Sequence, residues 1–234
     1  MAAGTGFYNA AVPADEKSSL RSSALTLGEF VERLASAEPV PGGGSASAVA
    51  ASLGAGLVAM VAGLSVGRPK YAAHAALHEQ AIATGQRLAT RFLELSDIDA
   101  AAYAGFAAAL KMPRDTAEER STRGDALKAA ARAAADVPLT TVEACLELVA
   151  TAESLVGRSN ANASSDLNVA ALLAEAAGRG AAENVLVNLP AVGDEAYSAT
   201  TTTRVVSLLD DIEELAAAVH AGVRAGTPRD PLPE

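Results

Sequence analysis

The stretch Pro39-Val40-Pro41-Gly42-Gly43-Gly44-Ser45, followed by the run of small residues 46–67, decides the fold of this chain. The run carries no charged residue and consists largely of alanine, serine, glycine and a few larger aliphatic residues. Consecutive glycines allow a tight turn, and serine is a favoured residue at the start of a helix. The stretch therefore predicts a glycine turn that opens a long helix, with Ser45 as its N-cap.

The apolar helix that this run predicts has two possible environments. It is long enough to cross a bilayer at about 1.5 Å per residue. Its alanine, serine and glycine make insertion marginal, however, and neither end has an aromatic anchor. A helix that is apolar on all sides has to be enclosed, and its glycines would let another helix approach closely. We expect the central helix of a soluble bundle, at a dimer interface, and no membrane span.

Composition points to an all-α, single-domain, multi-helix bundle around this small-residue helix. Half of the 234 residues are apolar, so the chain can bury a sizeable core. Aromatic residues make up only 3% and tryptophan is absent, so alanine, valine and leucine on closely spaced helices must fill that core. Residues 185–187 resemble a strand, but they lack a second β-rich run to pair with. We expect essentially no sheet.

The positions of capping residues, prolines and apolar repeats divide the chain into three parts. Residues 1–22 read as a flexible lead-in without the apolar core of a signal peptide, residues 23–225 as the helical domain, and 226–234 as a flexible tail. We expect a cytoplasmic protein. Within the domain, Thr26 and Thr116 are expected N-caps, and prolines are expected to separate helices. The expected helices are 27–37, 46–67, 71–95, 97–112, 117–136, 139–156, 164–180 with a continuation at 181–189, and 205–219.

Several classes of function are disfavoured. The net charge is −10 and the positive residues are scattered, which argues against nucleic acid as a partner. Cys145 is the single cysteine and lies in an apolar helical pattern, so we expect a reduced, buried thiol. His74 and His78 are four residues apart but lack the glutamate of a zinc-binding helix. We expect no metal.

Two features near the central helix suggest a binding site for an anion. Free backbone N–H groups and the helix dipole favour a carboxylate or phosphate at the glycine turn, although such a turn also permits close helix packing. At the other end of the helix, Arg68 and Lys70 bracket a turn. Their charges suit the dipole there, and they could equally hold an anionic ligand.

Asp99 is the carboxylate with the most unusual surroundings. Tyr103 lies four residues on and Phe106 three further, so all three share one face of an otherwise alanine-rich helix. Burial there would raise the pKa of the carboxyl towards values useful in proton transfer. A capping or surface role is the alternative for Asp99, and Asp97 fits the first turn of a helix, where it would meet the dipole.

The polar stretch 157–166 lies between two apolar helices. It places Asn162, Ser165 and Asp166 near a helix start, where such residues commonly act as caps. The same amide and carboxylate groups could hydrogen-bond the polar edge of a heterocycle. The residues alone leave both readings open.

The order of these motifs resembles that of the cyclodeaminase/cyclohydrolase family, over about residues 25–219. The motifs that carry the resemblance are Pro39-x-Pro41-Gly42-Gly43-Gly44-Ser45, Gly67-Arg68-x-Lys70-Tyr71, Asp99-x-x-Ala102-Tyr103, Lys111-Met112-Pro113, Asn160-x-Asn162-Ala163-x-Ser165-Asp166 and Asn184-x-x-x-Asn188. The resemblance implies an all-helical homodimer that acts on one-carbon derivatives of tetrahydrofolate.

The resemblance implies a cyclodeaminase that converts 5-formiminotetrahydrofolate to 5,10-methenyltetrahydrofolate and ammonia. An alternative is a cyclohydrolase that opens 5,10-methenyltetrahydrofolate to 10-formyltetrahydrofolate. A further alternative is a non-catalytic helical dimer that binds folate or a partner protein. No stretch resembles a formiminotransferase domain, so the formimino group is expected to be loaded elsewhere.

The chemistry that the resemblance implies, together with the motifs, indicates which residues should form the site. Asp99 and Asp166 are the expected catalytic acid and base. No metal or cofactor beyond the tetrahydrofolate substrate is expected. The expected substrate-binding residues are Gly42, Gly43, Gly44, Ser45, Arg68, Lys70, Tyr103, Asn162 and Ser165.

Overall fold

The computed structural model describes residues 21–232, and all regular structure in this range is helical. The all-α prediction is therefore confirmed. Of the expected lead-in over residues 1–22, residues 1–20 lie outside the described residues, and Ser22 already belongs to the first 3-10 turn. The elements are the 3-10 turns η1 (Ser22–Ala24), η2 (Pro69–His74) and η3 (Ala161–Ala163), and the helices α2 (Leu27–Leu34), α3 (Gly43–Gly63), α4 (Ala75–Leu110), α5 (Ala117–Leu155), α6 (Ser164–Val192) and α7 (Glu195–Ala225).

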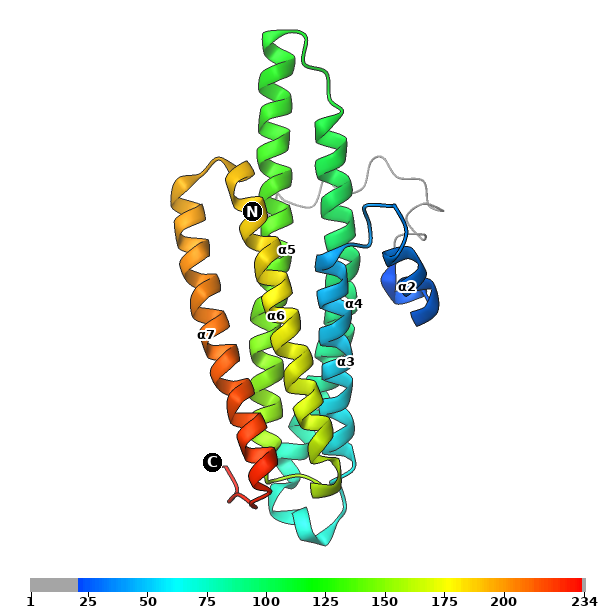
Figure 1. Ribbon diagram of the computed structural model, residues 1–234, viewed down its shortest axis with the longest axis vertical. Coiled ribbons are helices and arrows are strands. Elements are labelled where there is room, and N and C mark those ends of the chain that lie inside the picture. Colours follow the sequence, from blue (N-terminus) through cyan, green and yellow to red (C-terminus); the bar gives the residue numbers. More distant parts are fainter. Residues whose placement is uncertain (1–20, 233–234) are drawn as a thin grey trace, which may run out of the picture.

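The five long helices form an up-and-down bundle in which neighbours along the chain run antiparallel (Figure 1). Helix α3 packs against both α4 and α6, while α5 packs against α4, α6 and α7. The α4–α5 hairpin projects beyond the ends of the other helices (Figure 1). The start of α3 therefore lies at the base of this projecting hairpin.

Several expected helix breaks are wrong. Residues 71–95 and 97–112 were expected as two helices, but α4 runs through Asp97, whose carboxylate instead accepts hydrogen bonds from the backbone N–H of Ser22 and from Ser23 Oγ. Helix α5 continues through Pro138 and α6 through Pro190. Packing along the whole length of these helices outweighs the loss of one hydrogen bond at each proline.

The expected caps have mixed outcomes. Thr26 and Thr116 both cap their helices, each in a reciprocal arrangement with a glutamate three residues on, as predicted. Ser45 is not an N-cap, because α3 begins at Gly43 with Gly42 as its N-cap. Ser45 lies in the first turn of the helix, and its hydroxyl is buried against α4.

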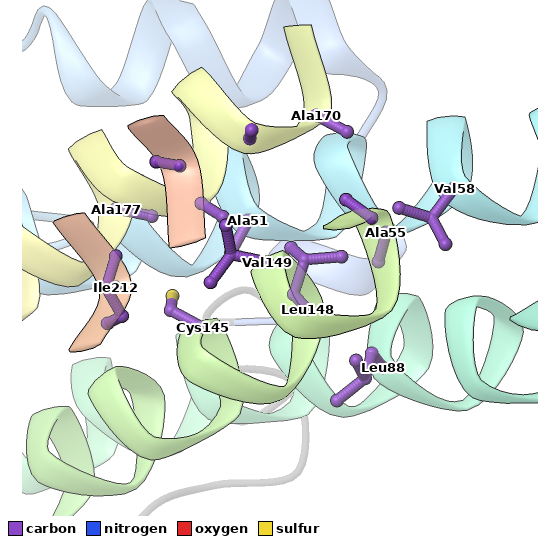
Figure 2. Packing of buried hydrophobic residues seen from close by; sticks show 14 of the residues in the cluster. Ala51, Ala55, Val58, Leu88, Cys145, Leu148, Val149, Ala170, Ala177 and Ile212 are labelled. Atoms are coloured by element: carbon purple, nitrogen blue, oxygen red, sulfur yellow. The ribbon is translucent and has the colours of Figure 1, made fainter. Parts of the chain in front are cut away.

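Small side chains allow the helices of the core to approach closely (Figure 2). Ala51 and Ala55 of α3 lie with Leu148 and Val149 of α5 in one buried cluster. Cys145 belongs to the same cluster as a free, buried thiol, as expected, and burial raises its pKa to about 12. The volume of the core therefore comes from aliphatic residues, in agreement with the composition.

Within one chain, helix α3 is not enclosed on all sides. Among the described residues it is the one helix long and apolar enough to cross a bilayer, judged by length and composition only, and 39% of its most apolar window is buried. Leu53, Met60 and Leu64 are 53%, 41% and 43% exposed on the open face. Gly56 and Gly63 on this face have no neighbouring atom within 4 Å of an added Cβ. Within one chain, an apolar face of α3 stays uncovered.

Candidate active site

A pocket of about 270 Å³ lies at the start of α3, where the glycine turn meets α4, α5 and α6. Its walls combine a carboxylate, two aromatic rings, two side-chain amides and exposed glycine backbone. The lining residues are Pro39, Val40, Gly42, Gly43, Gly44, Asp99, Tyr103, Phe106, Ala134, Asn184 and Asn188.

Asp99 supplies the carboxyl group of this pocket. It is half-buried, and Ser45 Oγ donates a hydrogen bond of 2.9 Å to its Oδ2. Burial raises the pKa of Asp99 above the ordinary aspartate value, although the hydroxyl and backbone of Ser45 oppose the rise by favouring the ionised form. A carboxyl whose pKa moves towards neutral is suited to both accept and donate a proton.

Gly44 lies so close to Asp99 that no side chain fits between them. A Cβ at Gly44 would be 2.3 Å from Oδ1 and 2.7 Å from Cγ of Asp99. The start of α3 thus faces a carboxylate of the chain itself, where its free N–H groups and dipole favour negative charge. The sequence suggested that Gly44 forms a turn or helps to bind an anion. In the structure, glycine is required at this position because the Asp99 carboxyl packs directly against it.

Two aromatic rings of α4 form the apolar part of the pocket. Tyr103 and Phe106 lie one and two turns beyond Asp99 on the same face of the helix, as the sequence spacing predicted. Tyr103 is 44% exposed. The pocket therefore offers a flat apolar wall next to a single carboxyl, which suits a planar ring with a polar edge.

Asn184 and Asn188 were absent from the predicted site. They lie one turn apart on α6 and line the same pocket as the α4 residues. In the sequence they contributed only to the family resemblance. The available signal was a pair of amides four residues apart on an alanine-rich helix.

The predicted residues Arg68 and Lys70 lie at the opposite end of α3. Arg68 lines a second pocket of about 220 Å³, together with Val66, Tyr71, His78 and other residues of the turn after α3. Lys70 Nζ lies 5.4 Å from the centre of the Tyr71 ring. Both cationic side chains are exposed, as a ligand-binding role would require.

The predicted residues Asn162, Ser165 and Asp166 lie at this same end, where α6 begins. The polar stretch before α6 is held against the end of α3, because Ser65 Oγ accepts from the backbone N–H of Asn160 at 2.8 Å and Tyr71 Oη from that of Ala161 at 3.0 Å. Asn162 and Ser165 are exposed and Asp166 is half-buried.

The predicted site residues therefore form two groups within one chain. Gly42, Gly43, Gly44, Ser45, Asp99 and Tyr103 gather at the start of α3, whereas Arg68, Lys70, Asn162, Ser165 and Asp166 gather at its end. The 21 residues of α3 separate the two groups by about 30 Å at 1.5 Å per residue. One chain does not bring Asp99 and Asp166 together.

Comparison with known proteins gives consistent matches. A sequence model of the family described as formiminotransferase-cyclodeaminase matches residues 26–207. A methenyltetrahydrofolate cyclohydrolase of Methylorubrum extorquens is 32% identical over 200 residues, which cover 86% of this chain and 96% of that protein. A formimidoyltransferase-cyclodeaminase of Rattus norvegicus is 34% identical over 86% of this chain, but the match spans only 37% of the rat protein.

The fold has a solved counterpart. The crystal structure of formiminotetrahydrofolate cyclodeaminase from Thermotoga maritima superimposes with a TM-score of 0.77 at 25% sequence identity, covering 87% of this chain and 98% of that one. The match to the family extends over the glycine turn, Asp99 and the polar stretch before α6 alike. This chain belongs to the formiminotransferase-cyclodeaminase family.

Proposed function

We propose that this protein is a formiminotetrahydrofolate cyclodeaminase, which converts 5-formiminotetrahydrofolate to 5,10-methenyltetrahydrofolate and ammonia. The observation that carries the proposal is the half-buried Asp99 carboxyl, with its raised pKa, beside two aromatic rings at the start of α3. The names of the rat and Thermotoga relatives support this choice of reaction.

The reaction requires a proton to move between two nitrogens. N10 attacks the formimino carbon of the protonated substrate, which forms the C–N10 bond and a tetrahedral centre. N10 then loses its proton and the terminal nitrogen gains one, so that the C–N bond to this nitrogen breaks and ammonia leaves. The remaining electron pair on N5 forms the methenyl double bond, and the positive charge stays on the product.

Asp99 is placed to take this proton from N10 as a carboxylate, and Asp166, the other expected catalytic carboxyl, is the acid that protonates the departing nitrogen. A raised pKa brings the two forms closer in free energy, and positioned acid-base groups contribute about 10²–10⁴-fold to a rate. The hydroxyl of Ser45 holds Oδ2 of this carboxyl at 2.9 Å.

The aromatic wall suits the ring systems of a folate. Tyr103 and Phe106 would pack against the pterin or benzoyl ring. The glutamate carboxylates of a folate need cationic donors. Arg68 and Lys70 could supply them, but they lie at the other end of α3 in the same chain.

A second copy of the chain resolves this separation, and we include a homodimer in the proposal. The open face of α3 carries no charged residue between Ala46 and Gly67, so it favours an apolar partner. A two-fold axis across the middle of α3 would pack this face against itself. The start of α3 in one protomer would then lie beside the end of α3 in its partner.

Such a dimer would place the two groups of site residues side by side. Asp99 and Tyr103 of one protomer would lie near the partner subunit's Arg68, the partner subunit's Lys70 and the partner subunit's Asp166. Each dimer would contain two such composite sites.

Cyclohydrolase activity is a second candidate, because the Methylorubrum cyclohydrolase matches this chain along 96% of its own length. In that reaction water adds to the methenyl carbon, the C–N5 bond breaks and 10-formyltetrahydrofolate forms. The Asp99 carboxylate would take one proton from the water and pass it to N5, while the second proton of the water leaves the new formyl oxygen for the solvent. The same pocket therefore fits both reactions.

The absorbance of 5,10-methenyltetrahydrofolate distinguishes the two reactions. Purified protein is mixed in separate cuvettes with 5-formiminotetrahydrofolate and with 5,10-methenyltetrahydrofolate, each against a blank without protein. We expect accelerated appearance of the methenyl band in the first cuvette. Accelerated loss in the second cuvette alone would assign the cyclohydrolase reaction. Rates equal to both blanks would contradict either reaction and favour the non-catalytic folate-binding dimer.

A further inference from the structure

The side-chain amide of Asn188 uses both of its hydrogens on backbone carbonyls. Nδ2 donates to the carbonyl oxygen of Asn184 at 2.7 Å on its own helix and to that of Ala134 at 3.1 Å on α5. Both acceptors are carbonyls, so the nitrogen must face them and Oδ1 must face away. The contacts of Asn188 therefore fix which atom of the amide faces the pocket.

Pro138 explains why the carbonyl of Ala134 is free to accept. In an uninterrupted helix this carbonyl would accept from the backbone N–H of residue 138. Proline has no such N–H, so α5 leaves the Ala134 oxygen unpaired within the helix. The proline that the sequence suggested as a helix break thus supplies the anchor for a side chain of the pocket.

Asn188 Oδ1 is the atom of the amide that remains available to accept a hydrogen bond. Among residues 21–232, no side chain or backbone N–H donates to it, and Asn188 lines the same pocket as Asp99 and Tyr103. A second amide, Asn184, is held in a similar way, since its Nδ2 donates to the carbonyl oxygen of Gly180 at 2.8 Å. Nδ2 of Asn184 lies 3.6 Å from where a Cβ at Gly43 would be, so the amide oxygen offered to a ligand in this pocket is that of Asn188.

We propose that Asn188 is a specificity-determining residue that accepts a hydrogen bond from the formimino N–H of the substrate. This inference rests on the proposed function, because it concerns the group that the cyclodeaminase reaction expels. The protonated formimino group carries N–H donors on its terminal nitrogen. A formyl group in the same position presents an oxygen with lone pairs instead.

The fixed amide of Asn188 should therefore discriminate between the formimino and the formyl compound. A formimino N–H meets the acceptor, whereas a formyl oxygen would face Oδ1 with no hydrogen between them and leave both polar atoms unpaired. The Asn188 amide cannot rotate to offer its nitrogen without abandoning the carbonyls of Ala134 and Asn184. Asn188 would thus orient the leaving nitrogen and reject 5-formyltetrahydrofolate as a competitor.

The test compares 5-formiminotetrahydrofolate with 5-formyltetrahydrofolate in the native protein, Asn188→Ala and Pro138→Ala. The readouts are kcat/KM for the formimino substrate and Kd for the formyl compound, with circular dichroism as a check on folding. Asn168→Ala is the matched control, because Asn168 lies on the same helix but its Oδ1 contacts His220 Nδ1 on α7 at 3.2 Å.

Asn188→Ala should lower kcat/KM for the formimino substrate on the order of 10- to 100-fold, as expected for loss of a hydrogen bond to a charged donor. The Kd of the formyl compound should stay unchanged or fall. Pro138→Ala supplies a competing N–H for the Ala134 carbonyl, so it should give a smaller loss of the same kind with Asn188 still present. Asn168→Ala should match the native protein.

Equal losses with both ligands, or no loss with either, would overturn the inference. Failure of the proposed function looks different, because the native protein itself would then show no turnover of the formimino compound. In that case Kd values for both compounds replace kcat/KM. A native preference for the formimino compound that disappears in Asn188→Ala would still support the inference, and any other result would contradict it.

Discussion

Asp99 and Gly44 form the contact on which the proposed chemistry depends. Gly44 belongs to the glycine turn that dominates the sequence, and Asp99 lies on a different helix. Their contact explains why glycine is needed at this position, because any Cβ would overlap the carboxyl group. The position of the carboxyl is therefore set by the absence of a side chain on α3.

Substitution of Gly44 by alanine should displace this carboxyl. Its Cβ would lie 2.3 Å from Asp99 Oδ1, so the carboxyl must shift by about 1 Å, a displacement that can cost about 10²-fold in rate. We expect turnover to fall by about this factor in a folded protein, as measured by the methenyl absorbance. Gly124→Ala is the control, since an added Cβ there meets no atom within 4 Å. Native turnover in Gly44→Ala would contradict the proposed placement.

The raised pKa of Asp99 predicts a pH-dependent effect on stability. Burial raises the pKa, so the folded state binds this proton more tightly than the unfolded state, and ionisation of Asp99 costs stability at neutral pH. Asp99→Asn removes the cost. Its melting temperature should therefore exceed that of the native protein at neutral pH, and the difference should shrink towards pH of about 4, near the ordinary pKa of aspartate. A difference that is independent of pH would show that the pKa of Asp99 is unchanged by folding.

Single residues also show what the sequence could reveal about the site. Asp99 was identifiable because a carboxylate beside aromatic residues is unusual on an alanine-rich helix. Asn188 was not, because its role depends on the carbonyl of Ala134, on another helix and 54 residues away. Ser45 was wrongly predicted as a cap, since its buried hydroxyl instead contacts Asp99 and the carbonyl oxygen of Ser96 on α4.

Helix α3 and helix α4 are held together by an approach that only small residues allow. Gly85 of α4 lies directly against the backbone of α3, and an added Cβ would be 2.7 Å from the carbonyl oxygen of Ala55 and 2.9 Å from the nitrogen of Ala59. Neither backbone atom can move without displacing its helix. The crossing of these two helices also positions Asp99 against the start of α3.

Gly85→Ala should therefore destabilise the fold. Overpacking typically costs about 1–3 kcal/mol, which exceeds the gain of about 0.5–1 kcal/mol from replacing a helical glycine by alanine. Gly105→Ala on the same helix is the control, because an added Cβ there meets no atom within 4 Å and only the gain remains. Urea unfolding measures both variants. Equal stability of the two would show that the helices separate without cost.

The helices themselves were largely predictable, but their lengths were not. Thr26 and Thr116 marked helix starts correctly, because capping is a local interaction that the sequence records. Pro138 was predicted to end a helix, yet α5 continues through it. The carbonyl oxygen that the proline leaves without a backbone donor accepts a hydrogen bond from a side chain of α6 instead. Whether a helix survives a proline depends on tertiary contacts that no local pattern reports.

The arrangement of the whole molecule leaves its most apolar helix half exposed. The sequence predicted that α3 would be enclosed, and composition suggested a dimer interface, but one chain covers only one face. The same helix separates the two groups of predicted site residues. A sequence pattern could not reveal this separation, because it follows from the direction and length of α3.

A charge on the open face of α3 should dissociate the proposed dimer. We expect the native protein to have twice the chain mass of 23.4 kDa by light scattering, and Leu53→Glu, at a side chain 53% exposed in one chain, to have the mass of one chain. Turnover should be lost with the dimer. Val206→Glu on α7 is the control, because Val206 is 51% exposed and lies away from α3. An unchanged mass for Leu53→Glu would place the interface elsewhere.

The composite site is tested most directly by a mixed dimer of Asp99→Asn and Asp166→Asn subunits. The two variants are co-expressed with different tags, and the mixed dimer is purified and assayed for formation of 5,10-methenyltetrahydrofolate. If each site takes Asp99 from one subunit and Asp166 from the other, one of the two sites is fully native. The mixed dimer should then turn over at about half the native rate, although each variant alone is nearly inactive. A rate no higher than the mean of the two variants would show that both carboxylates act within one chain or that one of them has no catalytic role, and would contradict the composite site.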